Sequence, residues 1–492
     1  MKFTCIIWIL ILLMSLSCLR QKGNVPLRLA VELDVGESSE IELTNGEEVT
    51  LTLEGVEVLR DDLRGAIREV RVSVEVNGEK AIMGSGLYHL PVEVGGIQID
   101  CPVVKNYYTN SNADHWGLAK DARFRLWPAG SPYMEPGSFV YPVRQRWFAS
   151  MTQSGNEPTY VDWGENPSGT SIYYHSGHDI GGAEGKDEIL SAVDGLILSS
   201  AGDTLQGYTD FPGDIRKDVV WVLSDLGWYI RYSHMDSIFP SILPGKRIST
   251  GEPIGLMGKQ GGSGGWVHLH FEMMNRETAS GEWGTEEAYP YLWEAYVRQY
   301  QPALMPVARP HQLAWTGQPV TFDGSKSRSM AGQIVSFDWS FSDGSSREGP
   351  AQERIYSEPG EYSEILKITD DRGNVDYDFT VVQVYDRIHP NRSIPVLQPA
   401  YYPTLGIKAG DPVTFMVRSF NTDTGNEVWD FGDGSNVVLT KSEPPTRQNY
   451  TRGKFAETVH AFSAPGDYIV SVERADSLGQ LARAHLHVVV EP

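Results

Sequence analysis

Alternation of apolar and polar residues with a period of two recurs along much of the chain and predicts β-strands. The most regular example follows a glycine-dense loop, residues 258–265. Its apolar positions share one parity: Val267, Leu269, Phe271 and Met273. His268, His270 and Glu272 occupy the other parity. Because successive side chains of a strand point to opposite faces, one face belongs in a core and the other presents two imidazoles and a carboxylate.

Alternating runs also fill the first part of the chain. Within residues 24–135, Asn45-Gly46 and Asn77-Gly78 each separate two such runs, which is the strongest local signal for a β-hairpin. We therefore predict a β-rich N-terminal domain there. Residues 277–300 instead place apolar side chains at near-helical spacing and predict one short helix that packs on the region before it.

An internal repeat occupies the last third of the chain. Residues 339–344 read Trp-Ser-Phe-Ser-Asp-Gly, and residues 429–434 read Trp-Asp-Phe-Gly-Asp-Gly. Turn residues between alternating runs predict two Ig-like β-sandwiches, at 301–388 and 392–492. The second copy ends with His485-Leu-His487. No glycine loop precedes this tripeptide, so we expect a terminal strand whose polar face is exposed to solvent.

Charge and cysteine content narrow the classes of function. The formal charge is 41 − 64 = −23, which repels nucleic acid and excludes it as a partner. The chain has three cysteines, Cys5, Cys18 and Cys101. This number is too small for a disulfide framework or a cysteine-based zinc site, so any metal must be held by histidine and carboxylate.

Residues 1–18 predict a signal peptide. Lys2 precedes an apolar run at 5–14, which is too short to span a bilayer, and small residues follow it. Cleavage after Ser17 leaves Cys18 first, which resembles the end of a bacterial lipoprotein signal. We expect an extracytoplasmic protein, either secreted or anchored to the cell envelope by a lipid on Cys18.

The polar residues that suggest chemistry lie between Tyr173 and Met274. Five of the twelve histidines occur there: His175, His178, His234, His268 and His270. Imidazole and carboxylate are the ligands that zinc takes when thiolates are absent, and three protein ligands with an open position form a catalytic site. The spacing alone does not choose between His268 and His270, whose Cα atoms lie about 6.6 Å apart in a strand.

The order of these residues resembles the LytM/lysostaphin-type zinc endopeptidases. The shared positions are His175-x-Gly-x-Asp179, Asp194-Gly195, Tyr232-x-His234, Pro244-Gly245 and His268-Leu-His270-Phe-Glu272. The resemblance covers about 100 of the 492 residues. It implies an antiparallel β-sheet domain with a duplicated hybrid motif, which we place at 136–300. It also implies Zn²⁺ as cofactor and hydrolysis of peptide bonds, most often in peptidoglycan cross-links.

The same resemblance assigns roles to individual residues. The zinc ligands that it implies are His175, Asp179 and His270. His268 becomes the general base that takes a proton from water, and His234 polarises that water or stabilises the oxyanion. Glu272 is expected to orient a ligand. Two features depart from the family: His178 precedes Asp179, where it could compete for the metal or shape the pocket, and the segment 205–218 is long enough to bear on substrate choice.

The two C-terminal sandwiches resemble polycystic-kidney-disease (PKD) domains, and we expect them to bind surface polymers or proteins. The fold class is therefore mainly β: a β-rich N-terminal domain, a LytM-type catalytic domain and two Ig-like sandwiches. A metalloendopeptidase acting on peptidoglycan or another peptide substrate is the leading hypothesis. Three others stay open: a non-catalytic LytM-type protein that binds the cell wall or serves as a scaffold there, a protease of extracellular proteins, and an adhesin.

Overall fold

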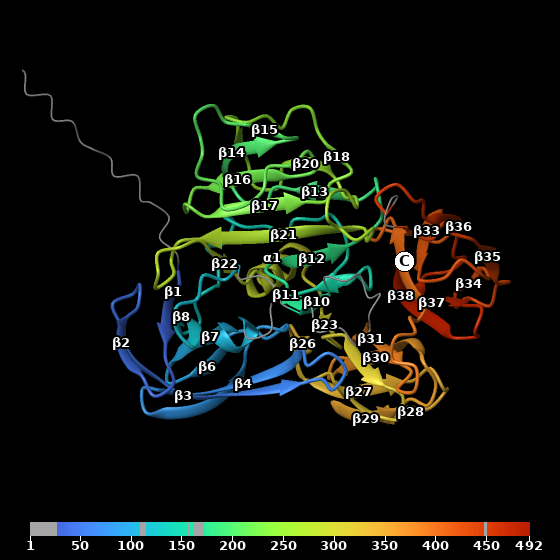
Figure 1. The fold of residues 1–492 in the computed structure, drawn as a ribbon, viewed down its shortest axis with the longest axis horizontal. Coiled ribbons are helices and arrows are strands. Elements are labelled where there is room, and N and C mark those ends of the chain that lie inside the picture. The colour runs from blue at the N-terminus through green and yellow to red at the C-terminus, as the bar shows by residue number, and fades with distance from the viewer. Residues whose placement is uncertain (1–26, 109–114, 156, 161–171, 447–449) are drawn as a thin grey trace, which may run out of the picture.

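The computed structural model describes residues 27–108, 115–155, 157–160, 172–446 and 450–492. The predicted signal peptide and Cys18 lie outside these residues. Within them the structure is nearly all β, which confirms the fold class predicted from the sequence. Figure 1 shows the N-terminal region in blue, a central region in green, and two sandwiches in yellow to red.

Two four-stranded antiparallel sheets form the N-terminal region. The first has the order β1 (Leu29–Leu33), β8 (Ala122–Pro128), β7 (Ile97–Val104), β6 (Val92–Val94). The second has the order β2 (Ser38–Glu42), β3 (Glu48–Arg60), β4 (Ile67–Val76), β5 (Glu79–Gly84). Asn77 and Gly78 join β4 to β5 with φ of 50° and 85°, as the predicted hairpin requires. A 3₁₀ turn, η1 (Lys105–Tyr108), follows β7.

A nine-stranded antiparallel sheet organises the central region. Its main path is β15 (Asp203–Thr204), β14 (Gly195–Ser200), β16 (Val220–Ser224), β17 (Tyr229–Ser233), β21 (His268–Asn275), β12 (His178–Gly181), β9 (Gln153–Ser154). Two short strands join it: β19 (Arg247–Ile248) beside β14, and β22 (Gly284–Glu286) beside β21. Smaller sheets combine β13 (Glu188–Leu190), β20 (Pro253–Leu256) and β18 (Ser237–Ile238), and pair β10 (Pro158–Tyr160) with β11 (Ile172–Tyr174). β21 thus lies inside the sheet, between β17 and β12.

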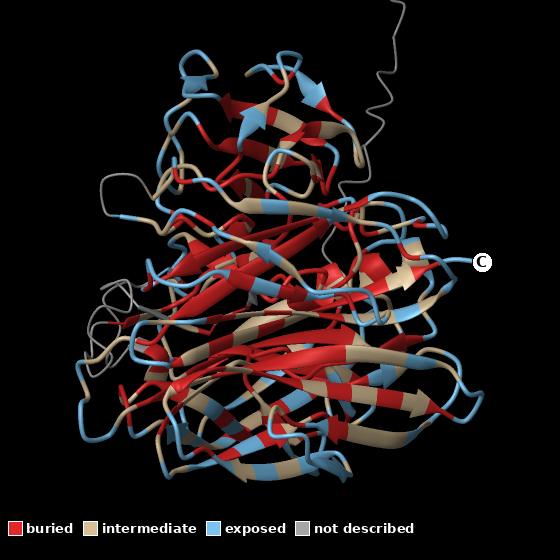
Figure 2. Cartoon of the chain, turned by 90° about the vertical axis from the view of Figure 1, so that its right-hand side faces the viewer, coloured by how far each residue is buried: buried red, intermediate tan, exposed pale blue. Residues whose placement is uncertain are grey.

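The predicted short helix is α1, Tyr289–Tyr300. It begins with Pro290 in its first turn, where the missing N–H costs nothing. Its buried face carries Tyr291, Leu292 and Ala295, which belong to the same apolar cluster as the core-facing side chains of β21. Figure 2 shows these central strands buried, with exposure concentrated in the loops and outer strands.

The two C-terminal sandwiches share one continuous sheet. Its path is β24 (Gln312–Trp315), β31 (Val375–Tyr385), β30 (Gly360–Asp370), β38 (Leu481–Val490), β37 (Gly466–Ala475), β34 (Glu427–Asp430), β35 (Val438–Thr440). Beside this path, β27 (Ile334–Ser340) pairs with β30, and β28 (Ser346–Glu348) pairs with β27. The opposing strands are β23 (Leu304–Met305) with β26 (Arg328–Ser329), β25 (Pro319–Asp323) with β29 (Ala351–Ile355), and β32 (Val396–Tyr402) with β33 (Val413–Phe420) and β36 (Ala456–His460). The two sandwiches meet where β30 pairs in parallel with β38.

This shared sheet overturns the prediction of an exposed polar face at His485-Leu-His487. His485 stacks on Phe379 of the first sandwich, with ring centroids 5.6 Å apart. Burial lowers the pKa of His485 to about 3. His487 lies 2.8 Å from Asp467 and 3.1 Å from Asp376. Alternation identifies the polar face of a strand, but it carries no information about a second domain that covers that face.

The second sandwich holds the glycine loop of the central region. Gln398 on β32 is fully buried, and its side-chain amide completes a pair of hydrogen bonds with the main chain of Val267. The N–H of Val267 donates to Gln398 Oε1 at 3.0 Å, and Gln398 Nε2 donates to the carbonyl of Val267 at 2.9 Å. The side-chain amide of Gln398 thus takes the place of a neighbouring strand as the hydrogen-bond partner of Val267, one residue before β21 begins.

Two further contacts from the second sandwich hold the residues just before Val267. Arg418 of β33 donates to the carbonyl of Gly265 at 3.1 Å. Trp266 stacks on Phe420 with ring centroids 4.4 Å apart and planes inclined by 8°. Gly265 has φ of 83°, and a Cβ there would lie 2.9 Å from the carbonyl oxygen of Tyr450. Both the backbone conformation and the lack of space therefore exclude a larger residue.

Replacing Gln398 with alanine should loosen the glycine loop without unfolding the protein. The substitution leaves the N–H and carbonyl of Val267 buried without partners, which costs about 1–3 kcal/mol. We expect amide hydrogen exchange in residues 258–268 to accelerate roughly 5- to 100-fold, as measured by mass spectrometry. Gln333→Ala, at an exposed position, is the matched control and should leave this exchange unchanged. Unchanged exchange in Gln398→Ala would show that the glycine loop does not need this support.

Candidate metal centre

Pairing between β12 and β21 places Asp179 directly opposite His270. His175 lies four residues before Asp179, at the end of the segment that leads into β12. His175 Nε2 lies 2.9 Å from His270 Nδ1 and 3.1 Å from Asp179 Oδ1. His270 Nδ1 lies 3.1 Å from the same carboxylate oxygen. Three donor atoms from residues up to 95 positions apart in sequence therefore converge on one point.

Gly177 allows this approach. A Cβ at Gly177 would lie 2.8 Å from the carbonyl oxygen of Phe271 and 2.9 Å from Cε1 of His270. No side chain fits in that space. The glycine of His175-x-Gly-x-Asp179 is therefore required by the packing of β12 against β21, and the two ligand candidates on either side of it are drawn together as a result.

Hydrogen bonds outside the cluster determine which imidazole nitrogen faces inward. His175 Nδ1 lies 2.7 Å from the carbonyl oxygen of Gly177 and 3.1 Å from that of Gly155, so Nδ1 carries a proton and Nε2 is the nitrogen that faces the cluster. His270 is turned the other way. Its Nε2 lies 3.5 Å from Glu272 Oε2, and its Nδ1 faces the centre. Glu272 is held in turn by Arg231 at 3.1 Å. The predicted orienting contact of Glu272 is thus present in the structure.

The electrostatics of the cluster favour a bound cation. Burial raises the pKa of Asp179, but His175 and His268 outweigh it and hold the pKa well below its ordinary value. Burial lowers the pKa of His175, but Asp179 and the two carbonyl oxygens overcome this effect and raise it to about 9. The pocket therefore stabilises an ionised carboxylate and positive charge beside it, which a divalent cation supplies.

The donor set fits zinc. Among the residues that the structure describes, His175, Asp179 and His270 form the one group of three metal-binding side chains whose donor atoms lie within 4.8 Å of one another. Two imidazoles and a carboxylate are a set that zinc accepts. Their separations of 2.9–3.1 Å approach the edge, about 3.3 Å, of a tetrahedron with bonds of ~2.0–2.1 Å. Three ligands leave one position of that tetrahedron for water or substrate.

His268 lies beside this cluster with a free nitrogen directed toward it. Its Nδ1 lies 3.0 Å from the carbonyl oxygen of Trp266 and therefore carries the proton. Its Nε2 lies 3.5 Å from Asp179 Oδ1. Burial lowers the pKa of His268, so the ring is neutral near pH 7 and Nε2 can accept a proton.

His234 contributes the fourth imidazole of the site. Its ring centroid lies 4.7 Å from that of His268 and 6.0 Å from that of His270. The backbone of His234 has φ of 66°, a left-handed conformation that is uncommon for a residue with a Cβ. Its Nδ1 donates to the carbonyl of Gln260 at 2.6 Å, which leaves Nε2 as a hydrogen-bond acceptor. Burial, together with neighbouring His268, lowers its pKa well below the ordinary value.

Comparison with protein families identifies the central region. The model of peptidase family M23 matches residues 173–281, and models of the PKD domain match residues 301–384 and 400–490. The chain carries an M23 peptidase domain followed by two PKD domains. This result confirms both resemblances that the sequence predicted. At the level of the family the central region is a peptidase, and M23 peptidases are typically zinc-dependent.

Solved structures resemble parts of the chain. The PKD1 domain of Epp from Vibrio anguillarum is 25% identical, with 17% of this chain and 96% of that chain covered and a TM-score of 0.16. The PKD1 domain of the Vibrio cholerae metalloprotease PrtV is 27% identical, with 16% and 90% covered and a TM-score of 0.13. Csd3 of Helicobacter pylori is 13% identical, with 55% and 80% covered and a TM-score of 0.21. At these TM-scores none of them reproduces the arrangement of the whole chain.

His178 plays no part in the metal centre of the M23 domain. It is adjacent to Asp179 on β12 and therefore points to the opposite face, where Tyr88 and Tyr289 lie 6.2 Å and 5.9 Å away between ring centroids. Burial lowers its pKa to about 3. Of the two roles considered for His178, competing for the metal is incompatible with this position, whereas packing beneath the site agrees with it.

Asp218 is a site residue of the M23 domain that sequence reasoning missed. It ends the long segment 205–218, and its Oδ2 accepts a hydrogen bond from the main-chain N–H of His234 at 3.2 Å. The same carboxylate lies 3.7 Å from Nδ1 of His234. Asp218 thus stabilises the unusual backbone of His234. No motif identifies it, because the contact depends on how the segment folds back against the end of β17.

Zinc content should distinguish the roles of His175 and His178 in the M23 domain. His175→Ala removes one of three converging donors, so we expect the purified protein to lose most of its zinc, measured by inductively coupled plasma mass spectrometry. His178→Phe keeps an aromatic ring in the apolar pocket and should retain about one zinc per chain. Full zinc content in His175→Ala, or loss of zinc in a folded His178→Phe, would contradict the assignment.

Proposed function

We propose that this protein is a zinc-dependent endopeptidase that hydrolyses peptide bonds, with peptidoglycan cross-links as its substrate. The observation that carries this proposal is the arrangement of four histidines and one aspartate. Three donors converge on one point, and two further imidazoles present acceptor nitrogens beside it. The non-catalytic alternative is less well supported, because such a protein has no need of the complete set.

The residues divide between holding the metal and moving protons. His175 Nε2, Asp179 Oδ1 and His270 Nδ1 would hold zinc, which when bound polarises the substrate carbonyl and makes water more acidic. Glu272 and the carbonyl of Gly177 keep the two imidazoles in the required orientation.

His268 and His234 act on the attacking water. Both present an unprotonated Nε2, so a water between them can donate one hydrogen bond to each ring. His268 accepts a proton as the water oxygen bonds to the carbonyl carbon of the substrate. It then returns that proton to the departing nitrogen as the C–N bond breaks. His234, held by Asp218 and Gln260, aligns the water and does not compete for the proton, because its pKa is strongly lowered.

We propose that the enzyme works outside the cytoplasm. PKD domains are typical of extracellular proteins, and residues 1–18 predict export with Cys18 as a candidate lipid anchor. In the described part of the chain, no helix has the length and apolar character needed to cross a membrane. The PKD domains would hold the peptidase near a surface polymer or protein.

Two substitutions separate catalysis from metal binding. His268→Ala should keep zinc and lower kcat/KM by about 10²–10⁴, because the general base is lost while the three ligands remain. His270→Ala should lose both zinc and hydrolysis. Purified sacculi with different cross-link chemistry, and elastin as a protein substrate, are digested and the products identified by mass spectrometry. Hydrolysis retained by His270→Ala would refute the mechanism, and cleavage of elastin alone would replace peptidoglycan as the substrate.

A further inference from the structure

A cavity of about 200 Å³ lies between Asp179 of the metal centre and the first PKD domain. Asp179 and Trp266 form one part of its wall, and Leu313 and Val381 of the PKD domain form another. This volume equals about six or seven water molecules at ~30 Å³ each, enough for a side chain or a short piece of main chain. The candidate ligand Asp179 thus borders a pocket that the M23 domain and the first PKD domain form together.

Glu361, on β30 of the first PKD domain, lies in the wall of this pocket and is 1% exposed. Its Oε1 accepts a hydrogen bond from the N–H of Leu397 at 2.8 Å, and its Oε2 accepts one from Gln383 at 3.0 Å. Among the ion pairs of the described residues, none includes Glu361. By contrast Glu364, three residues later on the same strand, pairs with Arg354 at 2.6 Å.

A buried carboxylate without a cation is unusual, since leaving water costs several kcal/mol and a partner normally offsets that cost. Burial raises the pKa of Glu361 to about 8, and its two hydrogen bonds only partly oppose the effect. A cation beside Glu361 would favour the ionised carboxylate, so the pocket wall contains an acidic group that a positively charged ligand would ionise on binding.

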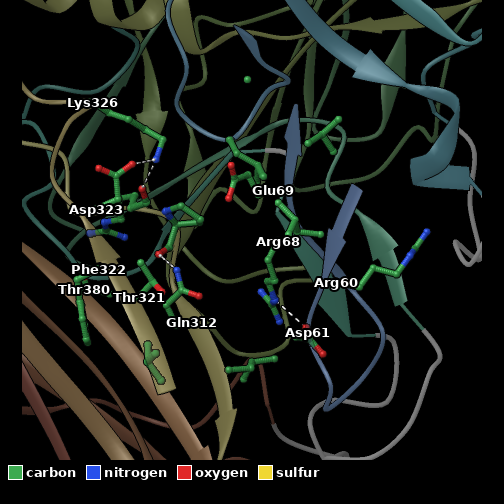
Figure 3. A pocket seen from close by; sticks show the side chains of 18 of the residues that line it. Arg60, Asp61, Arg68, Glu69, Gln312, Thr321, Phe322, Asp323, Lys326 and Thr380 are labelled. Atoms are coloured by element: carbon green, nitrogen blue, oxygen red, sulfur yellow. Dashed lines mark hydrogen bonds and ion pairs between the residues drawn. The ribbon is translucent and has the colours of Figure 1, made fainter. Parts of the chain in front are cut away.

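The other charged groups of the wall do not supply that charge. Arg68 is the basic residue of the lining, and it forms an ion pair with Asp61 at 2.7 Å, which Figure 3 shows. Glu157 adds a second acid, which accepts hydrogen bonds from Tyr88 and from the N–H of His311. His311 is neutral, because burial and Arg309 lower its pKa well below the ordinary value.

We propose that this pocket binds an ammonium group of the substrate peptide, with Glu361 as its anionic partner, and so selects peptides that carry a free amino group near the scissile bond. This inference rests on the proposed function and adds the first PKD domain to the substrate site. An ammonium ion donates three hydrogen bonds, and each oxygen of Glu361 has one further lone pair to accept them.

A second cavity gives the remainder of the peptide a place to continue. It measures about 610 Å³ and lies between the N-terminal region and the first PKD domain. Arg68, Gln312 and Leu313 line both cavities. Its wall is polar, with Asp323 and Lys326 on one side and Asp61 on the other (Figure 3). The two cavities thus adjoin each other along these three shared residues.

Paired peptides test the proposal. A fluorescent Gly-Gly-Lys-Gly-Gly peptide and its Nε-acetyl form are titrated by fluorescence anisotropy into the zinc-loaded, full-length His268→Ala protein, whose slowed turnover leaves time to measure binding. We expect the amine to be preferred by about 10- to 100-fold, because a hydrogen bond to a charged group is stronger than one to an amide. Equal affinity for the two peptides would overturn the proposal.

Glu361→Gln, introduced into the His268→Ala protein, tests whether Glu361 causes the preference for the amine. Glutamine keeps an oxygen for the N–H of Leu397 but no charge, so the preference for the amine should fall to about twofold or less. Glu364→Gln, a buried acid of the same strand outside the pocket, should keep the preference. A preference that persists in Glu361→Gln would overturn the role of Glu361. Failure of the wild type to cleave any peptide would refute the proposed function, whereas the binding ratio would still decide the subsite.

Discussion

The antiparallel ladder between β12 and β21 sets the position of every group in the metal centre. In this register Asp179 faces His270 and Gly181 faces His268. A slip of one residue would turn the polar face of β21 into the apolar core and bring Leu269 and Phe271 to the site. β21 also pairs with β17 on its other side, and this second ladder places His234 at the end of β17 beside both histidines. The chemistry thus depends on backbone hydrogen bonds that contain no catalytic atom.

Each imidazole of the centre is oriented by a group that does not touch the metal. Main-chain carbonyls hold His175, His268 and His234, and a carboxylate holds His270. These contacts choose which nitrogen carries the proton before substrate arrives, so the protein does not have to reorganise during the reaction. The order of the motif along the chain determines which residues meet, whereas hydrogen bonds from distant loops determine what each of them can do.

Sequence patterns predict the parts of this structure that depend on local periodicity. The alternation at 267–273 predicts both the strand and its polar face, and Asn77-Gly78 predicts a hairpin that the structure contains. The convergence of the candidate ligands could also be predicted, because their order along the chain follows a family motif. Asp218, Gln398 and Glu361 were missed, because each acts through a fold that brings it to a site 16 or more residues away. The covered face of β38 was missed for the same reason, since alternation does not report a neighbouring domain.

The support that Gln398 and Arg418 give to the glycine loop makes the M23 domain depend on residues that are synthesised after it. A chain that has been made only through α1 contains the three candidate metal ligands, together with His268 and His234. It still lacks the residues that hold the loop before β21, because they lie more than 100 positions further on. The loop before β21 therefore gains these contacts only after the second PKD domain has folded. The second PKD domain thus contributes to the support of the segment that leads into β21.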